Sequence, residues 1–348
     1  MDVFRGATII GMILVNNPGD WSTVYAPLLH AEWHGWTPTD LIFPFFLFIV
    51  GVAIVLALGR RVEQGADRGA VVRKILRRSV ILFALGLFLS GFPFGLFGPR
   101  SFERLLETWR IPGVLQRIAV CYLLASLIFL YLRERTIKVG SAVILLGYWV
   151  LLVLVRVPAV DAAGQVSAMR VAPDLASKGQ HLAGWLDRVV FGNHLWVLGK
   201  VYDPEGILST LPALVTTLFG IFAGRLLVSK LPAMERVARL LVTGALLTVA
   251  GYVWSWFFPI NKALWTSSYT VFTAGLAFCA LGLAAWFFDL QNHPRLARPF
   301  AVYGVNAITV FVGSGLLART LGYVRIGAEG TRSLQAFLYQ TFLSSWLP

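Results

Sequence analysis

The chain is built from long, continuous apolar runs that are separated by shorter polar stretches. A helix needs about 20 mostly apolar residues to cross a bilayer, and it satisfies its own backbone hydrogen bonds there. The runs lack the alternation of apolar and polar positions that is typical of outer-membrane barrel strands. They predict membrane helices at about residues 4–17, 40–59, 79–97, 111–132, 137–156, 207–228, 237–258, 266–288 and 299–318, with a weaker tenth segment at 334–347.

The composition agrees with this pattern. Of the 348 residues, 57% are hydrophobic and only 14% are charged, whereas soluble domains carry roughly a quarter charged residues. We therefore predict an all-α polytopic membrane bundle of about ten transmembrane helices, which forms a single domain over residues 1–348. The first apolar run is expected to remain in the chain as a span and not to act as a signal peptide.

The net charge of +13 does not indicate nucleic-acid binding, because the basic residues lie between the apolar runs. That placement is typical of topology determinants and lipid headgroup contacts. The stretch "RRVEQGADRGAVVRKILRR" follows the second run, and other basic stretches follow the fourth, sixth and eighth. The positive-inside rule then predicts a cytoplasmic N-terminus and an extracytoplasmic loop around His30. Cys121 and Cys279 fall within apolar runs, so no disulfide is expected.

The largest stretch outside the predicted spans is the region at about 157–206, which the same rule places on the outer side. Within it, "HLAGWLDRVVFGNHLW" carries apolar residues at helical spacing. Such a segment suits a helix that lies at the membrane interface. We expect it to cover the outer mouth of a site.

Titratable groups gather in "LHAEWHGWTPTDLIFPFFLFIVG", just before the second apolar run. His30 and His34 flank Glu32, but this spacing is not that of a zinc protease, and no metal site is predicted. His30 could be an ordinary interfacial histidine, or it could transfer a proton near neutral pH with help from a carboxylate. Asp40 could cap the second helix or fix the tautomer of the histidine. Trp33 suits an aromatic belt, and equally a platform for a sugar ring.

Several other polar residues lie within or beside the spans, where burying them is costly. Asn16 ends the first run, and could simply terminate the helix or could polarise a carbonyl group. Arg5 could anchor the helix start together with Asp2, or contact an anionic ligand from the cytoplasm. Arg117 lies too deep in its span for an idle charge, which favours a paired or ligand-facing role.

Two outer segments add further candidates. Asp203 and Glu205 lie at the start of the sixth span, where acidic residues are common but could also bind a cationic amino group. Lys262 and Trp265 lie in a short outer hairpin. Asn306 falls within the ninth span, where a hydrogen bond between helices is the default interpretation. The absence of a Ser-His-Asp order, a phosphate-binding loop and clustered cysteines leaves serine chemistry and nucleotide hydrolysis unsupported.

Five motifs in fixed order now become informative: "DVFRG…MILVNNPG", "HAEWHGWTPTDLIFPFFLFIVG", "RIPGVLQRIAVCY", "YDPEGILSTLPA" and "PINKALWTSSY". Together they resemble the heparan-α-glucosaminide N-acetyltransferase family, and more closely its bacterial relatives, over nearly the whole chain. The resemblance implies about eleven spans, a homodimer and, for a bacterial relative, the inner membrane. The sequence departs from the family at His34, where animal enzymes have asparagine. It also ends at "SSWLP", where relatives continue into a last span.

The resemblance implies transfer of an acetyl group from cytoplasmic acetyl-CoA to the amino group of a glucosamine-type sugar on the outer side. His30 matches the catalytic histidine of the family, Asn16 matches the asparagine assigned to its site, and Asp40 is expected to orient the imidazole. The donor is expected to bind a set of arginines, namely Arg5, Arg77, Arg78 and Arg117. The acceptor sugar is expected to bind Trp33, Asp203, Glu205, Lys262 and Trp265.

Acetyl-CoA is expected as a co-substrate, with its anionic nucleotide held at the basic face and its thin pantetheine arm entering the bundle. His30 would either accept the acetyl group or deprotonate the incoming ammonium, and the sequence does not separate these roles. A different class of function is an amino-sugar transporter, in which the same polar groups would line a permeation path. Against it, the chain shows no broken helices in matching halves.

Overall fold

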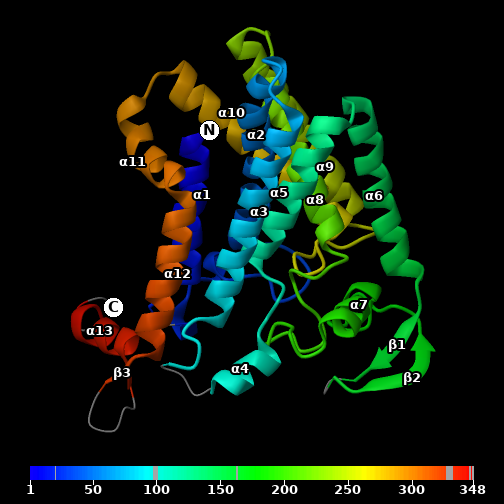
Figure 1. Cartoon of the computed structure of the whole chain (residues 1–348), viewed down its shortest axis with the longest axis vertical. Coiled ribbons are helices and arrows are strands. Elements are labelled where there is room, and N and C mark those ends of the chain that lie inside the picture. The colour runs from blue at the N-terminus through cyan, green and yellow to red at the C-terminus, as the bar shows by residue number, and fades with distance from the viewer. Residues whose placement is uncertain (20, 97–100, 162–163, 327–331, 345, 347–348) are drawn as a thin grey trace.

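The computed structural model describes residues 1–348 except 20, 97–100, 162–163, 327–331, 345 and 347–348. It is mostly helical, as predicted (Figure 1). The long helices are α1 Asp2–Asn16, α2 Ile42–Glu63, α3 Arg68–Gly91, α5 Val114–Tyr131, α6 Glu134–Leu154, α8 Thr210–Leu227, α9 Ala233–Trp254, α10 Ser267–Ala284, α11 Pro294–Val305 and α12 Ala307–Tyr323. Three shorter helices are α4 Phe102–Thr108, α7 Leu182–Phe191 and α13 Leu334–Phe342.

Strands are few and short. β1 Val157–Val160 pairs antiparallel with β2 Val166–Val171, with Val157 opposite Val171 and an irregularity before Val160. β3 Arg325–Ile326 pairs antiparallel with β4 Arg332–Ser333. These ribbons lie outside the helical bundle, so the predicted all-α membrane bundle holds with two small β-hairpin additions (Figure 1).

The predicted number of spans is not confirmed in the described part of the chain. Six helices in the described part of the chain are long and apolar enough to cross a membrane: Pro38–Gly59, Val114–Tyr131, Glu134–Leu154, Thr210–Leu227, Ala233–Trp254 and Ser267–Leu290. A seventh is obtained if α11 and α12, which meet at an angle of 70°, count as one broken span. The expectation of about ten transmembrane helices, or eleven by resemblance, is therefore not confirmed.

Two segments explain much of the difference. α1 has 15 residues, which span roughly 22 Å at 1.5 Å per residue and fall short of a core about 30 Å thick. The prediction of a tenth membrane segment at 334–347 is not confirmed over its described residues, because α13 has only nine residues. Apolar composition does not determine where a helix begins or ends. Here the Ser333 hydroxyl accepts the Ala336 amide and so caps the start of α13.

The break between α11 and α12 falls at Asn306, which we expected inside a continuous span. Its side chain is exposed and donates to the Val302 carbonyl one turn back, at 3.0 Å. The expected hydrogen bond between helices is therefore replaced by one within the end of α11. As a consequence α12 turns away from α11 and runs beside α1, where it can form a wall (Figure 1).

Close helix packing holds the bundle together, and small residues permit it. A Cβ atom on Gly51 of α2 would lie 1.9 Å from the Thr217 carbonyl oxygen of α8. One on Gly6 of α1 would lie 1.7 Å from the Phe300 carbonyl oxygen of α11. In lipid, helices gain stability mainly from such close contact, because the hydrophobic effect does not favour their association there. α1 is thus fixed by α11 while its other face stays open toward α2 and α12.

The helical bundle has two distinct ends. The N-terminal end holds the start of α1, the end of α2 and the start of α3, at the top of Figure 1. The opposite end, here called the His30 end, holds the loop between α1 and α2 together with α4, α7, β1 and β2 at the bottom (Figure 1). The region 157–206 lies at this end, and its predicted amphipathic helix is confirmed as α7.

Candidate functional site

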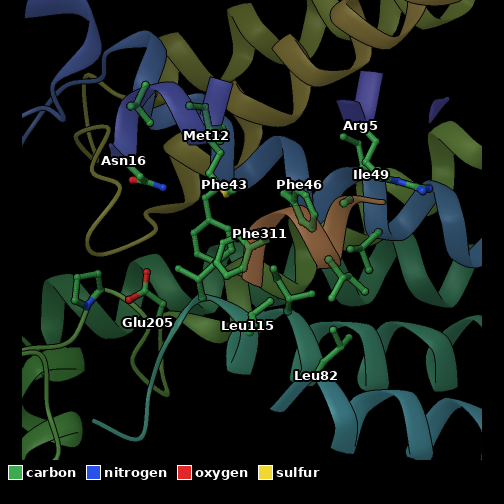
Figure 2. Close-up of a pocket in the computed structure, with 18 of the residues that line it drawn as sticks. Arg5, Met12, Asn16, Phe43, Phe46, Ile49, Leu82, Leu115, Glu205 and Phe311 are labelled. Carbon is green, nitrogen blue, oxygen red and sulfur yellow. The ribbon is translucent and has the colours of Figure 1, made fainter. Parts of the chain in front are cut away.

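A large cavity of about 1520 Å³ extends between α1, α2, α3, α5 and α12. It reaches Met1 and Arg5 at the N-terminal end, and His30 and Lys262 at the opposite end. Figure 2 shows Arg5 on one side of it and Asn16 and Glu205 on the other, with apolar side chains such as Phe43 and Phe311 between them. The two charged ends are therefore joined by an apolar passage.

The N-terminal mouth is basic. Arg5 lies 3.4 Å from the Asp2 carboxylate and donates to the Gly304 carbonyl at 3.2 Å, so both sequence interpretations, anchor and ligand contact, remain compatible with its place. Arg78 also lines the cavity and its guanidinium lies 5.6 Å from the centre of the Tyr122 ring. Arg77, its neighbour in the sequence, is exposed and is not part of the described lining.

The His30 end is formed by a loop of short 3₁₀ turns that leads into α2. Pro38–Leu41 is the last of these turns, and Thr37 and Asp40 form a reciprocal cap at its start. The Asp40 carboxylate accepts the backbone amides of Ala31 and Thr37, each at 3.0 Å. Asp40 is thus the third residue of this capped turn and not the cap of α2 itself, and the amides of Ala31 and Thr37 fix the direction of its carboxylate.

The same carboxylate contacts the candidate histidine. Oδ1 of Asp40 lies 2.7 Å from Nδ1 of His30, and the Asp40 side chain is only 1% exposed, whereas that of His30 is 51% exposed. A buried carboxylate at this distance favours a proton on Nδ1, which places the lone pair of the neutral ring on Nε2. The expected role of Asp40 in orienting the imidazole agrees with this geometry.

Lys262 joins this pair from a distant part of the sequence. Its Nζ lies 2.9 Å from Nδ1 and 3.3 Å from Nε2 of His30, and 3.3 Å from Oδ1 of Asp40. Burial lowers the pKa of Lys262 below its usual range, although the charges of Asp40 and Glu205 act in the opposite direction. We expected Lys262 to bind the acceptor, and the structure places it directly against the histidine.

A second charged cluster, made of Arg110, Asp203 and Glu205, lies beside the first. Arg110 donates to both oxygens of Asp203, at 2.5 and 2.9 Å, and to Glu205. Burial acts to raise the pKa of Glu205, but the neighbouring Arg110 and Arg117 outweigh it and leave that pKa below its usual value. Glu205 lines the cavity, whereas Asp203 is buried behind it and is not part of the described lining.

Two further predicted contact residues are buried away from the cavity. Arg117 is 2% exposed, and it donates to the Gly206 carbonyl at 3.1 Å and to the Ser209 hydroxyl at 2.5 Å. Its guanidinium lies 5.2 Å from the centre of the Trp265 ring, which is itself 1% exposed. Both thus support the segment that carries Glu205, and neither is part of the described cavity lining.

Trp33 links the His30 loop to the region 157–206. Its indole donates to the Leu175 carbonyl at 2.7 Å, and its ring packs against those of His181 and Tyr202. Trp33 also lines the cavity, together with Lys178, Trp196, Leu198, Tyr202 and Pro204 of that region. The region therefore covers the His30 mouth, as expected, and leaves Trp33 with one side toward the cavity.

Asn16 ends α1 at the same mouth and lines the cavity with His30 (Figure 2). The following Asn17 caps the helix by donating to the Ile13 carbonyl at 2.8 Å. Asn17 therefore terminates the helix, and Asn16 lines the cavity. In the described part of the chain no group of three or more His, Cys, Asp or Glu side chains is placed to hold a metal ion.

Some contacts could not be found from the sequence. Arg110 is not among the predicted site residues, although it anchors Asp203 and Glu205 from 93 and 95 positions away. Tyr269 is not among them either, and its hydroxyl donates to the Asp40 carbonyl at 2.5 Å. The available signal for both was only a polar group at the edge of an apolar run, which many idle residues share.

Comparison with known proteins adds a family. A family model described as "Heparan-alpha-glucosaminide N-acetyltransferase, catalytic" matches residues 1–176, which include Asn16, His30 and Asp40. The chain is 29% identical to the human (Homo sapiens) heparan-alpha-glucosaminide N-acetyltransferase over 90% of its own length and 52% of that protein. It is 29% identical to the mouse (Mus musculus) protein of the same name over 91% of its length and 53% of that protein. The chain thus spans about half the length of these curated relatives.

Proposed function

The chain belongs to the heparan-alpha-glucosaminide N-acetyltransferase catalytic family, and on that basis we propose that it transfers an acetyl group through a membrane. The donor is acetyl-CoA bound from the N-terminal, cytoplasmic end, and the acceptor is the amino group of a glucosamine-type sugar at the opposite end. One observation carries this proposal: a single cavity joins the basic mouth at Arg5 and Arg78 to the His30–Asp40 pair.

The dimensions of the cavity suit the donor. Arg5 and Asn16 both line it and are 11 positions apart on α1, which corresponds to about 16 Å along the helix axis. An extended pantetheine arm, with its peptide-like bonds, is about 15–20 Å long. The anionic nucleotide would remain at Arg5 and Arg78, and the thioester would lie near His30 and Asn16. Arg77 and Arg117 have no place in this arrangement.

The chemistry rests on the tautomer that Asp40 favours. With the proton on Nδ1, the Nε2 atom of His30 has a free lone pair that can attack the thioester carbonyl or remove a proton from the acceptor amine. As the carbonyl carbon becomes tetrahedral, its oxygen gains negative charge. The Asn16 amide is proposed to donate a hydrogen bond to this oxygen, a contact that stabilises the transition state more than the ground state.

The acceptor sugar is proposed to enter between the His30 loop and the region 157–206. Trp33 offers an aromatic face for the sugar ring, and Glu205 offers a carboxylate to its ammonium group. Asp203 and Trp265 contribute only from behind, by holding Glu205 and the Lys262 loop in place. The expected homodimer, the bacterial inner membrane and the orientation with His30 outside stay predictions that follow from the resemblance and the charge pattern.

The proposal can be tested with the purified chain in lipid vesicles that contain radiolabelled acetyl-CoA, with glucosamine added outside. Label should appear outside as N-acetylglucosamine. His30→Ala should reduce transfer to background, and His293→Ala should not change it, because His293 is exposed and lies at the other end of the bundle. Wild-type turnover by His30→Ala would remove that residue from the mechanism. Entry of unmodified glucosamine in the absence of acetyl-CoA would instead identify a transporter.

A further inference from the structure

Lys262 belongs to a loop whose hydrogen bonds hold it close to His30. Within residues 259–266 the Asn261 side chain accepts the Leu264 amide at 2.8 Å, and the Thr266 hydroxyl donates to the Pro259 carbonyl at 2.9 Å. The Ile260 carbonyl accepts the Gly35 amide at 2.8 Å, which ties this loop to the one that carries His30. The closeness of Lys262 to the histidine is thus built into both loops.

The contacts at Nδ1 of His30 compete with one another. Asp40 approaches it at 2.7 Å and can only accept a proton, whereas a lysine ammonium approaches it at 2.9 Å and can only donate one. In a neutral imidazole, Nδ1 is either a donor or an acceptor. With the proton on Nδ1, the lone pair of Nε2 is free only if Lys262, whose Nζ also lies 3.3 Å from Nε2, does not donate a proton to it. A neutral amine at Lys262 meets this condition.

The proposed reaction needs a basic group without its extra proton, such as a neutral lysine amine. An ammonium acceptor loses two protons when its nitrogen forms the amide bond. One of them ends on the sulfur of CoA, after the bond from sulfur to the acetyl carbon has broken. The other must leave the site. His30 has one free lone pair and can carry only one proton at a time, so a second proton acceptor is required.

We propose that Lys262, as a neutral amine, removes the proton that must leave the site. It takes this proton from the ammonium of the acceptor before the attack and releases it to the outer solution. This inference rests on the proposed acetyl transfer and adds to it the group that makes an ammonium substrate usable. The neutral acceptor nitrogen then attacks the acetyl carbon and gives its next proton to Nε2 of His30. The bond from carbon to sulfur breaks, and His30 delivers this proton to the CoA thiolate. Atoms balance, with one proton released for each acetyl group transferred.

The surroundings of Lys262 favour an amine that changes its protonation state. It lines the cavity, its side chain is 24% exposed, and burial lowers its pKa. The charged groups that face it are Asp40 from the turn before α2 and Glu205 from the segment before α8, with His30 as its titratable neighbour. Arg110 neutralises much of the charge of Glu205, which limits how strongly that carboxylate can hold a proton on Lys262.

The test compares two acceptors that differ in the number of protons they must lose. Glucosamine arrives as an ammonium ion and loses two, whereas hydroxylamine is a neutral amine at pH 7 and loses only the one that CoA takes up. In Lys262→Met, acetyl transfer to glucosamine should fall about 100-fold or more, the usual effect of losing an acid–base group. Transfer to hydroxylamine should fall by less than about tenfold. Lys262→Arg should behave in the same way, because arginine does not deprotonate in proteins.

A matched control is Lys230→Met. Lys230 is exposed in the turn that follows α8, and its substitution should leave both reactions unchanged. The hydroxylamine reaction shows that the variant is folded and that its His30 is functional, after subtraction of the rate found with His30→Ala. Full glucosamine transfer by Lys262→Arg would overturn the inference and show that only the positive charge matters. Equal loss with both acceptors would also overturn it, in favour of a structural role. If the wild-type chain transfers acetyl to neither acceptor, it is the proposed function that fails.

Discussion

Nδ1 of His30 lies 2.7 Å from Oδ1 of Asp40, and the two residues belong to one loop although ten positions separate them. The second oxygen of Asp40 is occupied by the amides of Ala31 and Thr37. The carboxylate therefore cannot rotate without losing these bonds. This relationship makes the direction of the histidine ring a property of the loop.

Asp40→Asn should reduce acetyl transfer about 100-fold or more, because an amide cannot hold the Nδ1 proton as a carboxylate does. The loss should fall on kcat and should leave KM for acetyl-CoA nearly unchanged, since Asp40 lies at the far end of the donor passage. Steady-state kinetics with detergent-solubilised protein would measure both. Asp289→Asn, an exposed acid at the opposite end of the bundle, is the matched control. An unchanged kcat in Asp40→Asn would show that the Asp40 carboxylate is not needed for catalysis.

Arg77 and Arg78 offer a paired test of the donor passage. Only Arg78 lines the cavity, although both belong to the same basic cluster on α3. Losing one charge-assisted contact to a phosphate costs about 1.5–3 kcal/mol, so Arg78→Gln should raise KM for acetyl-CoA by roughly 10- to 100-fold. kcat should change little.

Arg77→Gln should leave both constants within about twofold, because Arg77 is exposed and is not part of the described cavity lining. Titration of binding with desulfo-CoA would give the same comparison without turnover. Equal effects of the two substitutions would mean that the basic face attracts the donor only through its overall charge.

This pair also shows what the sequence could and could not predict. Successive residues on a helix point about 100° apart, since a turn takes 3.6 residues. The basic cluster was recognisable from composition, but the face that meets the cavity depends on how α3 is rotated against α2 and α5. Such rotation is set by packing among helices that are distant in the sequence, and no local pattern records it.

The candidate site also contains a part that the sequence could predict and a part that it could not. His30, Asp40 and Asn16 lie within one short stretch, where turn signals at Thr37 and Pro38 and a helix end at Asn17 could be read directly. Lys262 meets His30 across 232 positions, and this contact could not follow from the sequence, although the orientation of His30 by Asp40 could be proposed from it. The membrane spans show the reverse problem, because apolar runs were visible but the break at Asn306 and the shortness of α13 were not.

The ion pair between Arg110 and Asp203 should matter greatly for stability. Asp203 has no exposed side-chain surface and Arg110 is 23% exposed. Removing one partner of a buried pair leaves an uncompensated charge and costs about 3–5 kcal/mol. Arg110→Met should therefore clearly lower the midpoint of thermal unfolding in detergent. It should also weaken binding of the acceptor, because Glu205 would lose the cation that holds it in place.

The pair Arg239–Glu235 is the natural comparison, since it joins exposed side chains on α9 at 2.7 Å with 57% and 40% of their surfaces accessible. Arg239→Met should cost less than about 1 kcal/mol. Thermal unfolding followed by tryptophan fluorescence would compare the two variants with the wild type. Similar midpoints for both would indicate that water or another cation compensates Asp203.

His181 should make the chain less stable in acid. Its ring is fully buried, Nδ1 accepts the Gly184 amide at 3.0 Å, and Nε2 lies 3.0 Å from the Lys178 carbonyl, so the neutral ring satisfies both contacts. Burial lowers the pKa of His181 from 6.5 to about 4. As pH falls, the unfolded chain therefore binds a proton before the folded one, and stability present above pH 6.5 is lost toward pH 4. Between pH 7 and pH 5 the loss should be about 2 kcal/mol.

His181→Gln should remove most of this dependence, because an amide can accept from Gly184 and donate to Lys178 without titrating. Denaturant unfolding of the solubilised chain at pH 7 and pH 5 would give the difference for each variant. His293→Gln, an exposed histidine at the other end of the bundle, should retain the full acid sensitivity of the wild type. If His181→Gln lost as much stability as the wild type, the sensitivity would have to come from other groups. Because His181 packs against Trp33, the acid-sensitive contact belongs to the region that covers the His30 mouth.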